Sequence, residues 1–258
     1  MTKCMICLAV YDTVENKRTD YTIQTWNSIN STIDNDEVRI FFIDNNSCSK
    51  TKKFLKDISK YDNVTVITNK ENIGTAEAIN KALKHRKKGE YAIKMDNDVA
   101  VHDFGWVDKM IRCFEIDPNL GILGLKRSDL PNHPDSREYP TEIKCLPHKL
   151  GEPWSIIEKC DDIIGTCTMF SPKLLEKIGY LYQPGLYGFD DVLMCSRSIL
   201  SGFYNAFYPS IEIEHLDDGK NPFTVWKRNY AGLYLGQIKG IIEKYQTGVR
   251  SVYYNPFD

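Results

Sequence analysis

The sequence predicts an α/β fold in which helices flank a mostly parallel central sheet, and three observations lead to this prediction. Short apolar runs, typical of strands buried on both faces, alternate with helix-like segments over residues 5–95. Strands separated by helical stretches of this length form βαβ units, whose strands pair in parallel. The composition, 42% hydrophobic and 26% charged over 258 residues, is that of a globular chain with a core of its own. We therefore expect residues 1–258 to form a single domain.

The first half is expected to alternate strands and helices. Apolar residues recur at helical spacing over residues 23–33 and 76–83, and a short helix is expected over residues 52–60. The predicted strands cover residues 5–10, 38–43, 64–67 and 91–95.

The second half is less regular. An amphipathic helix ends at Asp117, and another begins after Ser171, a typical N-cap residue that precedes Pro172. Residues 128–153 hold five prolines and are expected to form a long irregular segment. The other predicted elements are strands over residues 121–125, 163–170 and 211–213 and a helix over residues 192–200.

Charge and cysteine content exclude several classes of protein. With 33 basic and 35 acidic residues the net charge is −2, so nothing in the overall balance favours a nucleic-acid coat or an anionic membrane surface. No stretch reaches the 18 apolar residues of a membrane span. Of the eight cysteines only Cys4 and Cys7 have metal-site spacing, and no second pair completes a zinc set. We interpret all eight as reduced thiols of a cytoplasmic protein.

The most informative motif is Asp96-Asn97-Asp98, which directly follows a predicted buried strand. Ligands of open α/β sheets bind just outside the carboxyl ends of strands. Two carboxylates placed there repel each other unless a cation neutralises them, and oxygen ligands suit Mg2+ or Mn2+. Such an ion at Asp96 and Asp98 would bridge a diphosphate, with Asp96 and Asn97 also contacting that ligand.

Three other strand ends carry polar residues and are expected at the same edge of the sheet. Val10, Tyr11 and Asp12 end the first predicted strand, and Asp44 ends the second. A carboxylate accepts hydrogen bonds from a base or a ribose, and Tyr11 offers a ring for stacking. The Asn72-Ile73-Gly74 segment opens a helix, where free N–H groups favour an anion. Neither a dinucleotide-binding G-x-G-x-x-G motif nor a P-loop is present.

Two further candidates lie in the second half. Asp190 and Asp191 follow a glycine-containing turn at the start of a predicted helix, where acids serve either as structural caps or as a general base. Asp191 is the better candidate for the base and Asp190 the second. His215 follows a short strand and is either a third metal ligand, beside Asp96 and Asp98, or an ordinary packed histidine.

Taken in order, these motifs resemble the family 2 glycosyltransferases of GT-A fold. The resemblance covers most of residues 4–215 and lies in VYD, FFIDNNS, the Asn72/Gly74 and Ala78/Asn80 pairs, DND, GTCTMF and GFDDVLMCSR. It implies transfer of a sugar from a nucleoside diphosphate sugar, a UDP-sugar first among donors, to an acceptor hydroxyl.

The resemblance also implies roles for individual residues. Asp12 and Asp44 match positions that hold the nucleotide base and ribose, and Asp98 matches the direct metal ligand of the family's DxD motif, beside Asp96. Asp191 matches the catalytic base of inverting members, and His215 matches a histidine near the metal in some members.

Departures from the family pattern narrow the prediction. Asp190 stands where the family usually has Glu, and the QxxRW segment of processive synthases is absent. We therefore expect a non-processive enzyme that adds one sugar. Its Rossmann-like nucleotide-sugar half covers residues 1–98, its acceptor and catalytic half residues 99–219, and an aromatic and basic tail residues 220–258.

Several alternatives remain open at this stage. A sugar-phosphate nucleotidyltransferase would use a similar sheet and metal, and a non-catalytic sugar-binding module would keep the fold without the reaction. Acceptors in the family include saccharides, lipid-linked sugars, proteins and modified nucleic-acid bases. The tail, with Trp226 and Tyr230 beside basic residues, suits a peripheral membrane contact, a nucleic acid or packing against its own domain. The sequence does not indicate an oligomeric state.

Overall fold

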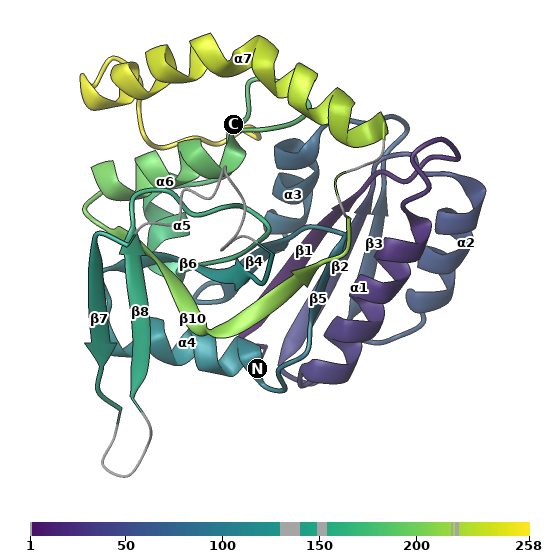
Figure 1. Ribbon diagram of the computed structural model, residues 1–258, viewed down its shortest axis with the longest axis horizontal. Coiled ribbons are helices and arrows are strands. Elements are labelled where there is room, and N and C mark those ends of the chain that lie inside the picture. The colour runs from purple at the N-terminus through teal and green to yellow at the C-terminus, as the bar shows by residue number, and fades with distance from the viewer. Residues whose placement is uncertain (1, 130–139, 149–153, 218, 220–221) are drawn as a thin grey trace.

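The computed structural model describes residues 2–129, 140–148, 154–217, 219 and 222–258 (Figure 1). Within these residues a sheet of ten strands runs through the whole molecule in the order β3-β2-β1-β4-β9-β6-β10-β8-β7, with β5 paired to β10. The predicted α/β class is confirmed.

The first half of the sheet is parallel, as the βαβ pattern predicted. Strand β1 pairs with β2 on one side and with β4 on the other, and β2 pairs with β3, all in parallel register. The carboxyl ends of these strands therefore lie at one edge. The bounds of the elements are β1 Cys4–Val10, α1 Thr19–Thr32, β2 Val38–Asp44, α2 Ser49–Ile58, β3 Val64–Thr68, α3 Thr75–Leu83 and β4 Tyr91–Met95.

The second half of the sheet is mixed. Strand β9 runs antiparallel between β4 and β6, whereas β6 and β10 are parallel. Strands β7 and β8 form an antiparallel hairpin beside β10. The bounds are β5 Val99–Val101, α4 Trp106–Ile116, β6 Leu120–Arg127, β7 Glu142–Leu146, β8 Ser155–Cys160, β9 Cys167–Phe170, α5 Pro172–Ile178, α6 Asp190–Leu200, β10 Tyr204–His215 and α7 Pro222–Gln246.

The predictions for this half need five corrections. Strand β7 lies inside the segment expected to be irregular, of which residues 130–139 and 149–153 lie outside the described residues. Its side chains are largely exposed, so its sequence has no apolar run to reveal it. Strand β9 is shorter than expected, β10 is longer, and neither β8 nor β5 was expected at all. A strand of three residues is too short to show a period.

Helices cover both faces of the sheet. One apolar cluster joins α1, α2 and α4 to one face of β1, and a second joins α3, α5 and α6 to the opposite face. Alternation along β1 explains this division, because Ile6 belongs to the first cluster and Cys7 to the second. The Ser171 hydroxyl caps α5 by accepting a hydrogen bond from the Leu174 amide, as the sequence predicted.

Helix α7 packs against its own domain. Figure 1 shows it crossing the top of the molecule above α6, and Ile238 and Tyr245 are buried there with Leu193. No helix among the described residues is both long and apolar enough to cross a bilayer. All eight cysteines are described and none forms a disulfide.

Candidate active site

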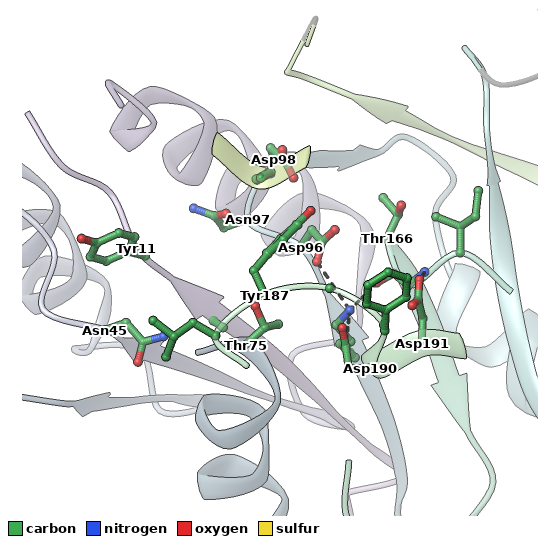
Figure 2. Close-up of a pocket in the computed structure, with 18 of the residues that line it drawn as sticks. Tyr11, Asn45, Thr75, Asp96, Asn97, Asp98, Thr166, Tyr187, Asp190 and Asp191 are labelled. Carbon is green, nitrogen blue, oxygen red and sulfur yellow. Dashed lines mark hydrogen bonds and ion pairs between the residues drawn. The ribbon is translucent and has the colours of Figure 1, made fainter. Parts of the chain in front are cut away.

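A cleft of about 220 Å3 lies at the carboxyl ends of β1 and β4, between the two halves of the chain. The starts of α6 and α7 close its other side. Figure 2 shows the acidic residues around it. The predicted site residues that line the cleft are Tyr11, Asn72, Asp96, Asn97, Asp98, Asp190, Asp191 and His215.

Asp12 does not line this cleft. Its buried carboxylate accepts hydrogen bonds from the hydroxyls of Thr22 and Thr51 and from the Asn97 amide. Burial raises the pKa of Asp12, and the hydrogen bond from Thr22 partly opposes that rise. In the described geometry Asp12 therefore orients Asn97 from beneath the cleft.

The other predicted residues outside the cleft lining are Val10, Asp44 and Gly74. The Asp44 carboxylate accepts the Ser47 backbone N–H at 2.7 Å, and Asp44 lines a separate hollow beside α2 and β3. Its neighbour Asn45 faces the cleft instead and donates its amide N–H to the Gly74 carbonyl at 3.2 Å. The Val10 carbonyl accepts the Asn45 backbone N–H at 2.8 Å, so Val10 also acts on the cleft through Asn45.

Gly74 allows a close approach of two loops. Its φ is +87°, and a Cβ there would lie 2.9 Å from the Leu186 backbone. Its neighbour Thr75 donates its backbone N–H to the Leu186 carbonyl at 3.1 Å. Glycine alone adopts this φ readily and has no Cβ to collide with the Leu186 backbone. The contact joins the loop before Asp190 to the start of α3.

Asp98 lies in a buried network of charges. Arg18 forms ion pairs with both Asp98 and Asp217, and all three side chains are buried. His215 Nε2 lies 3.3 Å from the Asp98 carboxylate. Burial opposes the charge on Asp98, but the His215 hydrogen bond and the Arg18 charge outweigh it and hold the pKa of Asp98 well below its usual range.

Asp98 and His215 fit a divalent cation. His215 Nδ1 donates to the Asp217 carbonyl at 2.8 Å, which leaves Nε2 on the side of Asp98. Metal-binding histidines commonly have such a partner on their other nitrogen. The described residues contain no preformed group of three His, Cys, Asp or Glu side chains. A carboxylate and one further ligand suffice, however, where substrate phosphates complete the coordination of Mg2+ or Mn2+.

Asp96 faces the cleft from the end of β4, with 40% of its side chain exposed. Its carboxylate is 3.9 Å from Lys94 Nζ. Partial desolvation by the surrounding cleft walls raises the pKa of Asp96 even though its side chain is open to the cleft; the Lys94 charge counters that rise, and the Asp98 charge adds to it. The predicted metal residues thus lie along one cleft wall, with Asp98 and His215 in contact and Asp96 nearer to Lys94.

The second acidic pair lies at the start of α6. Lys94 Nζ is 2.9 Å from the Asp190 carboxylate, and both side chains are buried. Lys94 also donates to the Gly165 carbonyl at 3.0 Å, and the Gly165 N–H donates to Asp191 Oδ2 at 3.0 Å. The backbone of one residue, Gly165, thus links Lys94 to Asp191. A Cβ at Gly165 would lie 2.6 Å from Lys94 Nζ, so a larger residue there would displace the lysine side chain.

Asp191, the predicted general base, lies at the start of α6. It is partly buried and lines the cleft. Burial and then the Asp190 charge raise the pKa of Asp191, while the Lys94 charge moderates the rise. A carboxylate with a raised pKa accepts a proton more readily than an ordinary aspartate.

Several cleft residues were missed by sequence reasoning. The sequence did indicate Lys94, because a lysine inside an otherwise apolar strand must be buried with a partner. Nothing in the sequence indicated Arg18, since it lies in a polar turn far from the acids along the chain. Trp226 and Lys227 were assigned to a tail, but α7 brings both to the cleft.

The fold and the site can now be compared with known proteins. The chain belongs to glycosyl transferase family 2, whose model matches residues 10–179. The prediction of a family 2 glycosyltransferase is confirmed. No curated protein sequence matches the chain significantly.

Several solved structures share the fold of this chain. A mannosyltransferase, PcManGT from Pyrobaculum calidifontis in complex with GDP-Man and Mn2+, is 16% identical with a TM-score of 0.70, covering 93% of this chain and 64% of that one. S. aureus TarS 1-349 in complex with UDP is 15% identical, with a TM-score of 0.63 and coverage of 83% and 60%. GalNAc-T7 with UDP, GalNAc and Mn2+ is 12% identical, with a TM-score of 0.61 and coverage of 83% and 44%. The chain therefore spans less than two thirds of each of these structures.

Proposed function

We propose that this glycosyltransferase moves one sugar from a nucleoside diphosphate sugar to an acceptor hydroxyl with inversion at the anomeric carbon. The observation that carries the proposal is the arrangement of two acidic pairs on one cleft, one beside a histidine and the other at a helix start. Residues 1–98 would supply the donor wall and residues 99–219 the base. Their contributions to the cleft support that division.

Asp191 would act as the catalytic base. The acceptor oxygen attacks the anomeric carbon from the face opposite the diphosphate, and Asp191 takes the proton of the acceptor hydroxyl. The Gly165 N–H holds one carboxylate oxygen and the Val192 N–H the other, at 3.0 and 2.8 Å. These two bonds set the direction from which the carboxylate receives the proton. Asp190, paired with Lys94, would support the base rather than replace it.

Asp98 and His215 would hold a divalent ion, Mn2+ or Mg2+, with Asp96 beside them. Such an ion supplies positive charge to the leaving diphosphate. The residues of the chain do the rest of the positioning: Asp12 and Thr22 orient Asn97 at the donor wall through hydrogen bonds at 2.8 and 2.7 Å. Two of the neighbours named above were solved with Mn2+.

A UDP-sugar is the donor we propose first. Tyr11 lines the cleft at the end of β1 with Asn45 and Asn72, a ring and two amides suited to a base and ribose. The TarS and GalNAc-T7 structures contain UDP. The proposal leaves the acceptor as a saccharide, a lipid-linked sugar, a protein or a modified nucleic-acid base. We place the reaction in the cytoplasm because all eight cysteines are free.

A donor screen tests this function. Purified protein is incubated with UDP-, GDP- and other nucleoside diphosphate sugars, with Mn2+ or with EDTA, and release of the nucleoside diphosphate is measured. We expect hydrolysis of one donor that requires the metal and is lost in Asp98→Ala. Full activity of that variant would remove the metal role, and a product of retained anomeric configuration, seen by NMR, would remove Asp191 as the base. Absence of turnover with every donor would contradict the proposed function.

A further inference from the structure

The loop that leads into the second acidic pair also closes the start of α3. Helix α3 has Gly74 as its N-cap, which has no side-chain oxygen to accept the first free N–H groups of the helix. The loop supplies these acceptors instead. The Leu186 carbonyl accepts the Thr75 N–H at 3.1 Å. Gln183 Oε1 accepts the Ala76 N–H at 3.1 Å, from 107 positions further along the chain. These two N–H groups are therefore not open to the anion that the sequence suggested there.

The amide nitrogen of Gln183 is directed toward the start of α6. It donates to the Gly188 carbonyl at 3.1 Å and to Asp190 Oδ1 at 3.4 Å. That carbonyl belongs to the peptide before Phe189, whose φ of +67° is uncommon for a residue with a Cβ. Such backbone conformations persist where neighbouring contacts hold them, and they gather at functional sites. The bond from Gln183 is one of these contacts, and it fixes the turn directly before Asp190 and Asp191.

Asp190 is therefore held through both of its carboxylate oxygens. Lys94 Nζ lies 2.9 Å from Oδ2, and the Gln183 amide donates to Oδ1. Lys94 contributes a charge, whereas Gln183 contributes a neutral donor and links Asp190 to the start of α3. Among the described residues Gln183 is not part of the cleft lining. In this geometry it acts on the reaction only through the residues that it holds.

We infer that Gln183 is a positioning residue for the proposed base, an inference that rests on the proposed function. Its amide nitrogen holds the turn before Asp190 and so sets where Asp191 stands at the cleft. Its amide oxygen, bonded to Ala76, fixes that turn relative to α3, whose first residue Thr75 lines the cleft. Gln183 neither gives nor takes a proton in the reaction. Its contribution is geometric, because a displacement of about 1 Å can lower a rate by about a hundredfold.

Two substitutions separate this role from a contribution to stability alone. Gln183→Glu keeps an oxygen for the Ala76 N–H, removes the N–H that Gly188 accepts and places a negative charge beside Asp190. Gln183→Met removes the acceptor and the donor together. The matched control is Ser171→Ala, which removes the same kind of bond, from a backbone N–H to a side-chain oxygen, at the start of α5. Turnover is measured with Mn2+ as release of the nucleoside diphosphate from the donor identified in the screen, and thermal melts measure stability.

We expect Gln183→Met and Ser171→Ala to lower the melting temperature by a similar amount, about 2–4 °C, because each loses one bond at a helix start. Only the Gln183 variants should lose turnover, with kcat falling about tenfold or more and the KM for the donor staying within about twofold. Gln183→Glu keeps the acceptor at the start of α3, so its kcat should fall with a smaller change in melting temperature.

Three results overturn the inference while the proposed function stands. They are a kcat that falls less than about threefold in both Gln183 variants, an equal fall in Ser171→Ala, and a change confined to KM. Failure of the unaltered chain to turn over any donor overturns both the inference and the proposed function.

Discussion

The two acidic pairs of the cleft are built alike in one respect and differ in another. In each pair one acid is buried against a cation from a distant part of the chain, Asp98 against Arg18 and Asp190 against Lys94. The difference lies in the remaining partner. In the first pair, Asp98 also contacts His215, a type of side chain that often binds metals. In the second pair, Asp191 instead accepts a hydrogen bond from a backbone N–H.

This difference is the basis of the separate tasks that we propose for the two pairs. His215 and Asp98 place a nitrogen and an oxygen side by side, the kind of donor set that holds a divalent ion. Within the described residues, Lys94 forms an ion pair with Asp190, and no cation lies that close to Asp191. The raised pKa of Asp191 suits proton transfer. On our proposal, two similar acidic pairs serve different chemistry because their neighbours differ.

The largest expected effect comes from Asp191→Asn. Loss of the base should lower kcat by about 100- to 10,000-fold, the range for general base catalysis, while donor binding stays near that of the unaltered chain. Turnover and nucleoside diphosphate affinity measure the two quantities. A kcat within tenfold of the unaltered value would show that another group takes the proton.

Removing the lysine that pairs with Asp190 should lower the free energy of unfolding. Lys94→Met leaves Asp190 buried without its cation, which costs about 3–5 kcal/mol in the free energy of unfolding. Lys126→Met is the matched control, because the Lys126–Glu158 pair is more exposed and lies outside the cleft lining. Its loss should cost only about 1 kcal/mol. Urea unfolding of both variants makes the comparison, and equal costs would contradict the buried role of Lys94.

The variant His215→Ala tests whether Asp98 and His215 bind a metal ion. If His215 is a ligand, its loss should weaken Mn2+ affinity by about 10 to 100-fold in the presence of UDP, a range seen when groups supporting a metal site are removed. Calorimetric titration with Mn2+ measures this. His102→Ala, at an exposed histidine outside the cleft lining, is the control and should leave the affinity unchanged. An unchanged affinity in His215→Ala as well would remove His215 from the metal site.

The smallest effect is a shift of the pH profile. Burial and the Asp190 charge raise the pKa of Asp191, and Asp191 must be ionised to accept a proton. The value of kcat/KM should therefore fall as the pH drops through this raised pKa, at a higher pH than an ordinary aspartate would give. The profile is measured at saturating Mn2+, so that protons do not compete with the ion. An acid limb at or below the usual range of aspartate would contradict the assignment.

Local patterns in the sequence were enough for the parallel half and for most of the site. Strand β4 was predicted with its observed bounds, because its run is apolar except for Lys94 and ends where the polar residues begin. The acids follow such ends and therefore meet at one edge of the sheet. By contrast, β7 is exposed along most of its length, and pairing with β8 rather than its own composition makes it a strand.

The roles of Asp12 and Asp44 show where strand ends are not sufficient. Both residues lie at the predicted edge, yet Asp12 faces Thr22 and Asn97 and Asp44 faces a different hollow. Which way a side chain points after a strand depends on the turn that follows and on the partners it finds there. Asn45 took the place at the cleft that the sequence suggested for Asp44.

By itself the sequence determined the fold class, the edge of the sheet that carries the site and the acids available there, because periodicity and strand ends are local properties. Only the tertiary structure decided how those acids are partnered. Arg18 reaches Asp98 across 80 positions of the chain and Lys94 reaches Gly165 across 71. Helix α7 then brings Lys227 to the cleft from a segment that the sequence indicated only as a tail. Contacts over such separations depend on how the packed elements fold back on one another, and no local pattern records them.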